Sequence, residues 1–170
     1  MRIALYARYS SDNQRDASIE DQLRQCRERA AREGWTVVES YSDRAISGAS
    51  LIRSGIQTLL ADAQTRGGYD VVIHNAGITR DRTIARMEPR EWDSVVAVNL
   101  TAPLTITRAL VEGGGMRANG RIVAVSSLSG IAGNMGQSNY ALSKAAWIGA
   151  VRRLAPQLAG QGLTINAVAP

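Results

Sequence analysis

Short apolar runs alternate with amphipathic stretches along the whole chain. Five runs, at residues 2–7, 35–41, 69–75, 121–127 and 163–169, are rich in Val, Ile, Leu, Ala and Tyr and predict β-strands. Between them, apolar residues recur at helical spacing and predict helices over about 18–33, 54–66, 89–112 and 139–160. The predicted order of elements is therefore β-α-β-α-β-α-β-α-β.

Signals for helix ends agree with this division. Ser18 is followed by Asp21, and Ser54 by Gln57, which is a spacing typical of a helix start. Glycines follow the predicted helices at 34, 67–68 and 113–115 and indicate helix ends. Pro103 falls inside the third predicted helix, where we expect a kink.

Apolar strands that are joined by helices are typical of a parallel sheet covered on both faces. We therefore predict a single α/β domain over 1–170, with a three-layer, doubly wound, parallel five-stranded sheet. Five strands in this order fit the flavodoxin-like, Rossmann-like arrangement 2-1-3-4-5, with right-handed crossovers.

Composition narrows the function classes. Of 170 residues, 45% are apolar and 21% charged, and no run of about 18 apolar residues predicts a membrane span. The polar N-terminus is unlike a secretion signal, so we expect a cytosolic protein. The net charge is +5, but the basic residues are scattered, which argues against nucleic-acid binding. No metal site is predicted, and the single Cys26 is expected to face the core.

The N-terminal part contains "YARYSSDNQ", "SIEDQ" and "YSDRAISGASLIRSG". With these motifs, residues 1–72 resemble the catalytic domain of the serine recombinases. The resemblance implies that Ser10 attacks a DNA phosphate, that Arg8 and Arg53 stabilise the phosphoryl oxygens and that Gln14 supports them. It stops before the family's further arginines, its dimerisation helix and its DNA-binding domain, so this site is incomplete.

The C-terminal part carries a second set of motifs: "NAG" at 75–77, Asn99, Ser127 in "VSSLSG", "YALSK" at 140–144 and "NAVAP" at the end. With these motifs in this order, residues 70–170 resemble the short-chain dehydrogenases/reductases, close to the 3-ketoacyl-carrier-protein reductase branch.

Residues four apart on a helix share a face, so a Lys144 ammonium can favour the ionised form of the Tyr140 hydroxyl. The resemblance implies that Tyr140 transfers the proton at a carbonyl oxygen, that Ser127 orients this oxygen, that Lys144 also holds the nicotinamide ribose and that Asn99 supports a proton-relay water.

The glycine-rich loop that normally cradles a dinucleotide is missing, because residues 8–13 read "RYSSDN". His74 also replaces the more usual asparagine before "NAG". No bound cofactor is therefore expected, although NADP(H) is the cofactor of the reductase family. Its remaining contacts, weak or lost, would be Asn75, Ala76, Gly77 and Lys144.

Two resemblances meeting inside one strand suggest an engineered chimera. In this interpretation a recombinase fragment over 1–72 supplies β-α-β-α and a reductase fragment over 70–170 supplies β-α-β-α-β, so both sets of catalytic residues are vestigial. The main hypothesis is a folded α/β scaffold with no native catalysis. Residual NADP(H)-dependent reductase activity or cofactor binding is the alternative, and recombinase-type DNA strand cleavage is a second one.

Two further expectations concern partners. The helices that carry Asn99 and Tyr140 pair with their copies in the reductase family, so we expect a homodimer that includes Trp92 and Trp147. An anion is expected in the crevice at the carboxyl edge of the sheet, which would be lined by Ser10, Ser11, Asn13, Asn75 and Gly77.

Overall fold

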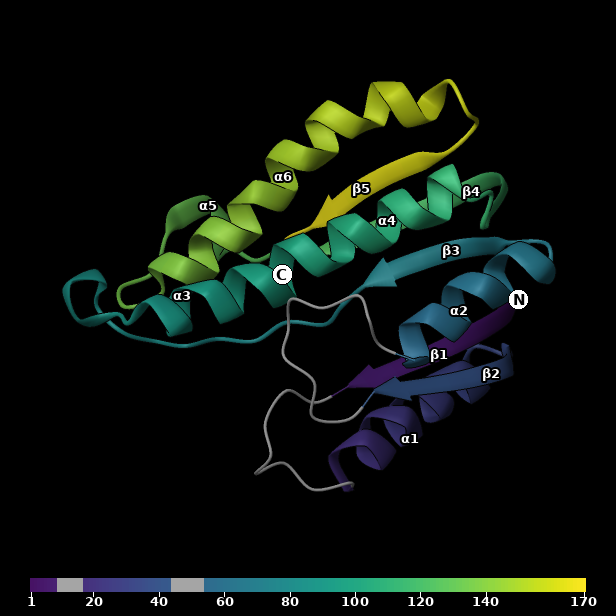
Figure 1. Cartoon of the computed structure of the whole chain (residues 1–170), viewed down its shortest axis with the longest axis horizontal. Coiled ribbons are helices and arrows are strands. Elements are labelled where there is room, and N and C mark those ends of the chain that lie inside the picture. The colour runs from purple at the N-terminus through teal and green to yellow at the C-terminus, as the bar shows by residue number, and fades with distance from the viewer. Residues whose placement is uncertain (9–16, 44–53) are drawn as a thin grey trace.

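The computed structural model describes residues 1–8, 17–43 and 54–170, in which strands and helices alternate (Figure 1). The strands are β1 (Arg2–Arg8), β2 (Thr36–Asp43), β3 (Tyr69–His74), β4 (Met116–Val125) and β5 (Thr164–Val168). The helices are α1 (Ala17–Arg32), α2 (Ser54–Thr65), α3 (Pro89–Val96), α4 (Ala102–Glu112), α5 (Ser129–Ala132) and α6 (Ser138–Ala159), with the turns η1 (Ile84–Arg86) and η2 (Ala97–Thr101). The predicted strands and helices are confirmed.

One long helical stretch is built from α3, η2 and α4, which follow one another without a break (Figure 1). The middle element η2 is a π-helical turn, which widens the helix locally. The irregularity expected at Pro103 is therefore a π turn that ends two residues before it. A proline has no N–H for the carbonyl four residues earlier, which here is that of Asn99 inside the π turn.

The parallel strands form two hydrogen-bonded sheets among the described residues. β1 pairs with β2, and β4 lies between β3 and β5. These pairings agree with the predicted order within each part, but they correct the expectation of one continuous five-stranded sheet, because β1 and β3 are not hydrogen-bonded to each other. A cavity of about 40 Å³ is lined by side chains of both strands, among them Ile3 and Tyr69, at their amino ends.

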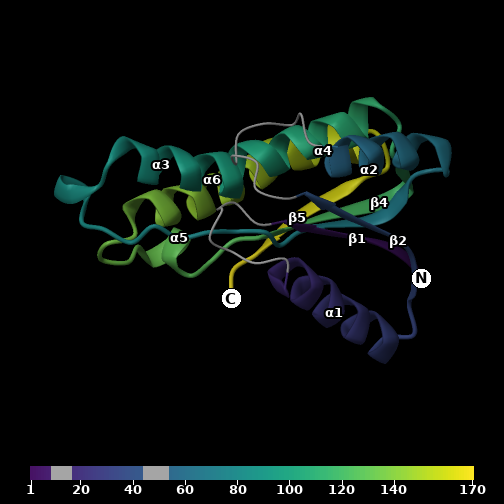
Figure 2. The same ribbon diagram turned by 60° about the horizontal axis from the view of Figure 1, so that its bottom comes forward.

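The helices cover the strands from two sides. Figure 2 shows α1 on one side of the strands and α2, α4 and α6 on the other, so the doubly wound α/β class is confirmed. The larger buried cluster joins β4 and β5 to α6 and consists of Ile122, Ala124, Trp147, Leu158, Leu163 and Ile165. A smaller cluster joins β1 to α1 and consists of Leu5, Ala7, Ile19 and Leu23.

The position of Cys26 differs from the expectation. Ile19, Leu23 and Ala30 are buried on α1 as predicted, whereas Cys26 is exposed. Among the described residues, the helix packs mainly against β1 and β2, and a two-stranded sheet is too narrow to cover the whole apolar stripe of a helix. Cys26 lies at the uncovered edge of that stripe.

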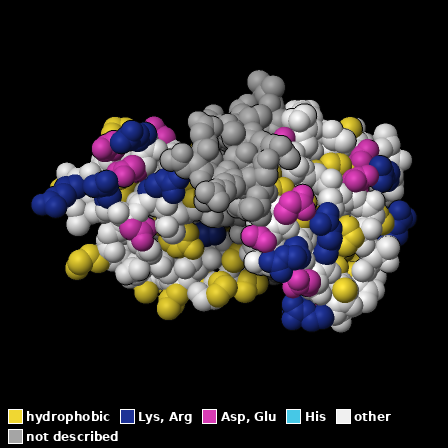
Figure 3. Space-filling model, turned by 90° about the horizontal axis from the view of Figure 1, so that it is seen from below, with side chains coloured by type: hydrophobic (Ala, Val, Ile, Leu, Met, Phe, Trp, Pro, Cys, Tyr) yellow, Lys and Arg dark blue, Asp and Glu magenta, His cyan; other side chains and the backbone are white. Residues whose placement is uncertain are grey.

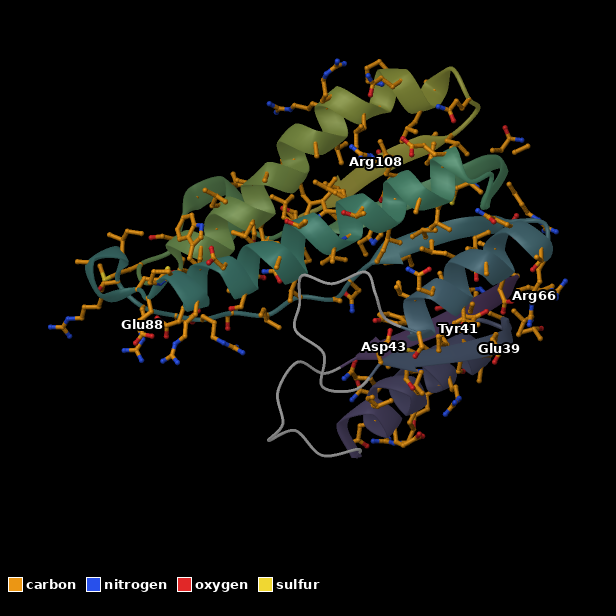
Figure 4. All side chains as sticks on the ribbon, viewed as in Figure 1. Glu39, Tyr41, Asp43, Arg66, Glu88 and Arg108 are labelled. Atoms are coloured by element: carbon orange, nitrogen blue, oxygen red, sulfur yellow. The ribbon has the colours of Figure 1, made fainter. Side chains whose placement is uncertain are left out.

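The start of α2 is held by a buried carboxylate from the end of β2 (Figure 4). The Asp43 carboxylate accepts hydrogen bonds from the amides of Gly55 and Ile56, at 2.9 and 3.1 Å, and from the Tyr6 hydroxyl at 2.9 Å. A side chain at position 55 would approach the Ser42 carbonyl to 2.6 Å, so this contact requires glycine. The carboxylate thus satisfies amides that a helix start leaves without partners.

The surface carries charges of both signs. Figure 3 shows basic and acidic side chains interspersed on the face viewed, in agreement with the scattered charge in the sequence. The stretch Pro89–Glu112 is long and apolar enough to cross a membrane by length and composition alone. Its side chains Leu100, Leu104 and Val111 pack against the larger buried cluster, as those of a core helix do.

Candidate functional site

The reductase-type residues gather where β3 and β4 end. The loop with Asn75, Ala76 and Gly77 follows β3, and Ser127 comes two residues after β4. Tyr140 and Lys144 lie one turn apart on α6, as their spacing predicts. The carboxyl ends of parallel strands are where α/β proteins place their ligands.

Lys144 is a buried cation within this group. Its side chain is 4% exposed, and its Nζ donates to the carbonyl oxygen of Val125, the last residue of β4, at 2.6 Å. The same Nζ lies 5.6 Å from the centre of the Tyr140 ring. Burial lowers the pKa of Lys144 below its usual range, because the charged ammonium loses hydration. One strand end and one helix thus fix this ammonium beside the tyrosine.

Asn99 connects α6 to the loop after β3. Its side chain is buried and makes two hydrogen bonds with the Ile78 backbone: Oδ1 accepts from the amide at 2.8 Å, and Nδ2 donates to the carbonyl at 2.9 Å. Nδ2 also donates to Ser143 Oγ at 3.2 Å, and the main-chain carbonyl accepts the indole N–H of Trp147 at 2.9 Å. The polar groups of Asn99 thus bind protein atoms and fasten the loop after β3 to α6.

Ser127 stands at the start of the segment that leads to α5. Its Oγ accepts the amide of Ser129 at 3.2 Å. A hydroxyl that accepts a bond in this way can still donate its own proton to a substrate oxygen. The neighbouring Ser126 is buried and its Oγ donates to the Lys144 carbonyl at 2.8 Å, which ties the end of β4 to α6.

Sequence reasoning missed Asn139, which is completely buried. Its Nδ2 donates to the carbonyls of Arg80 and Glu91, at 3.0 and 3.3 Å, and its Oδ1 accepts the Tyr140 amide at 2.7 Å. The residue thus fastens the start of α6, and with it Tyr140, to α3 and the loop before it. A polar residue directly before the candidate tyrosine was the available signal.

His74 and Trp147 lie behind the site. Their rings stack with centroids 5.5 Å apart, and His74 Nε2 is 2.8 Å from Thr107 Oγ1 on α4. Burial lowers the pKa of His74 to about 4. Trp147 is 2% exposed, so it belongs to the core of its own chain and is not available to a second copy, in contrast to the expectation.

The recombinase-type residues cannot be placed in the same way. Ser10, Gln14 and Arg53 lie outside the described residues, as does the side chain of Arg8. The expected anion crevice depends on residues of the same segment, Ser10, Ser11 and Asn13. Only its other side, formed by Asn75 and Gly77, is described, and both residues are exposed.

The described residues fit the nicotinamide end of a dinucleotide. A Cβ at Gly77 would lie 3.5 Å from Lys144 Nζ and 3.6 Å from Asn99 Oδ1, so the glycine keeps open the space in front of the ammonium. An exposed loop without a side chain there, beside a cationic donor, suits a ribose hydroxyl. The pyrophosphate end would fall on the segment without glycine, outside the described residues.

Comparison with known proteins identifies related sequences across the predicted junction. The family model for short chain dehydrogenase matches residues 24–170. The 3-oxoacyl-[acyl-carrier-protein] reductase of Thermotoga maritima is 48% identical over 107 residues, which are 63% of this chain and 44% of the relative. The Vibrio harveyi reductase of the same name is 35% identical over 141 residues, or 81% and 58%. Nodulation protein G of Rhizobium sp. is 45% identical over 103 residues, or 61% and 42%.

These matches correct the main functional hypothesis. A folded scaffold without catalytic function is wrong, because relatives named as reductases are 35–48% identical to the chain. The family match begins at residue 24, well inside the segment 1–72, so the comparisons give no support to a recombinase portion or to a chimera. The chain spans 42–58% of the length of the three relatives described above.

Proposed function

The chain belongs to the short-chain dehydrogenase family, and we propose that it is a reductase that converts a 3-oxoacyl group on a carrier protein to the 3-hydroxyacyl group. The buried Lys144 ammonium beside Tyr140 is the observation that carries the proposal. The names of the relatives supply the substrate class, which for this chain is part of the proposal.

The residues of the chain handle the proton and the orientation of the substrate. NADP(H), when bound, supplies the hydride. The Tyr140 hydroxyl donates its proton to the carbonyl oxygen, and the Lys144 ammonium stabilises the tyrosinate that remains. The Ser127 hydroxyl donates a hydrogen bond to the same carbonyl oxygen. The loop at 75–77 and Lys144 are the groups that would hold the ribose of this cofactor.

The test combines binding with turnover. NADPH fluorescence should change on titration with the chain, and NADPH absorbance should fall when an acetoacetyl thioester is added. We expect weak cofactor affinity because the glycine-rich loop is missing. A fluorescence signal without turnover would contradict the reductase proposal. No signal at millimolar cofactor would contradict cofactor binding as well.

We also propose that the chain forms a homodimer, in the cytosol, through the helices that carry Asn99 and Tyr140. Leu142 is 44% exposed on α6, and Ala145 and Gly149 continue the same exposed stripe. Sedimentation should give the mass of a dimer, and Leu142→Glu should give that of a monomer because it places a charge in the contact. Ala31→Glu, at an exposed position on α1, is the control that should leave the dimer intact. A monomer for the unmodified chain would refute this proposal.

A further inference from the structure

The Asn99 carbonyl has an unusual place in the long helical stretch. In a regular helix, the N–H four residues later would be its donor. That residue is Pro103, which has no N–H and whose ring disfavours a regular turn at this point. The π turn η2 surrounds the same carbonyl. With its regular donor missing, this carbonyl can accept a hydrogen bond from another element, which adds to its satisfaction in the interior.

Trp147 provides that donor from α6. Its indole N–H binds the Asn99 carbonyl oxygen at 2.9 Å, and its side chain is 2% exposed. The ring is also held by β3, because it stacks on His74 of that strand. An indole N–H can only donate, so this bond uses the single polar group of the side chain.

The Asn99 side chain connects this hydrogen bond to the site. The same residue that accepts the indole N–H holds the Ile78 amide and carbonyl with its amide group. Ile78 follows Gly77, whose missing side chain leaves the space in front of Lys144. A shift of the π turn would therefore move the 75–78 loop relative to the ammonium.

We infer that Trp147 is a positioning residue of the reductase site: its N–H replaces the donor that Pro103 lacks, locks the π turn and thereby holds the 75–78 loop against Lys144. The inference rests on the proposed function for its catalytic consequence. Its structural part concerns this chain alone and can be tested without turnover.

The first test is amide hydrogen exchange in Trp147→Phe, which removes the indole N–H. Loss of a buried hydrogen bond should speed exchange of the Ile78 amide about ten-fold. Trp35→Phe, in the turn between α1 and β2, is the matched control and should leave Ile78 within two-fold. In Trp147→Phe, the KM for NADPH should also rise about ten-fold while kcat changes less than three-fold, because we propose that the 75–78 loop holds the cofactor.

The second test restores the missing donor. Pro103→Ala returns an N–H at the position that normally binds the Asn99 carbonyl, so Trp147→Phe should speed Ile78 exchange no more than three-fold in this background. If Trp147→Phe does not fold, β-(3-benzothienyl)alanine at position 147 keeps the ring shape without the N–H and should give the same ten-fold effect. Unchanged Ile78 exchange, or an equal effect in both backgrounds, would overturn the inference. Absence of reductase activity alone would overturn only the proposed function, because exchange needs no turnover.

Discussion

Replacing Tyr140 with phenylalanine is expected to lower kcat for reduction of a 3-oxoacyl thioester by about a thousand-fold. The substitution removes the hydroxyl proton and leaves the ring that stands 5.6 Å from Lys144 Nζ. A general acid at a carbonyl oxygen acts mainly in the transition state, so the KM for the substrate should change little. Steady-state rates of NADPH oxidation measure both quantities.

The control for this prediction is Tyr69→Phe. Tyr69 is the first residue of β3, at the opposite end of that strand from the site, and its hydroxyl donates to the Leu59 carbonyl of α2. Its loss should leave kcat within three-fold of the unmodified chain. A Tyr140→Phe variant that retained a tenth or more of the activity would show that another group supplies the proton.

The fold was largely predictable, because apolar period and glycine or proline positions determine where strands and helices begin and end. The spacing of apolar residues does not indicate which strand edges pair. β1 and β3 were each predicted correctly, yet no hydrogen bonds join them, and residues that include Ile3 and Tyr69 line a cavity at their amino ends. The exposed Cys26 follows from the same narrow sheet, and no local pattern reveals it.

The site was predictable where its geometry is local. Tyr140 and Lys144 share a face because they are four residues apart on one helix, and the structure places them so. The Asn99 side chain binds the Ile78 backbone, which is 21 residues away in the sequence. No local residue pattern predicts these two hydrogen bonds. Pro103 did signal an irregular helix, but no local pattern indicated the indole N–H of α6 that binds the Asn99 carbonyl.

The functional hypothesis went wrong because a missing loop was given more weight than the residues that are present. Absence of glycine at 8–13 weakens the binding of a pyrophosphate, which is one part of a dinucleotide. It does not remove the residues that we propose transfer the proton. The chain retains Ser127, Tyr140 and Lys144, and the buried ammonium is held in place by β4. A site of this kind can lose affinity for its cofactor and keep its chemistry.

Acidification should destabilise the chain through its single histidine. The pKa of His74 is about 4 in the folded chain and 6.5 when unfolded. Between these values the unfolded chain binds a proton that the folded chain excludes, so the free energy of unfolding falls as the pH is lowered from 6.5 to 4. It does not change through this group above pH 6.5. The full loss is about 3 kcal/mol.

Urea unfolding at pH values from 7 to 4.5, compared with His74→Asn, isolates this contribution. Carboxylates titrate at the lower end of the range in both proteins, so their effect cancels in the difference. The variant removes the only histidine and the ring stacked on Trp147, so it should be less stable at pH 7. The difference in the free energy of unfolding between the unmodified chain and the variant should then shrink as the pH falls, because the variant has no buried imidazole to protonate. Parallel stability curves over this range would mean that the folded chain accepts a proton on His74 as readily as the unfolded chain does, and that the His74 environment beside Thr107 and Trp147 is open to water.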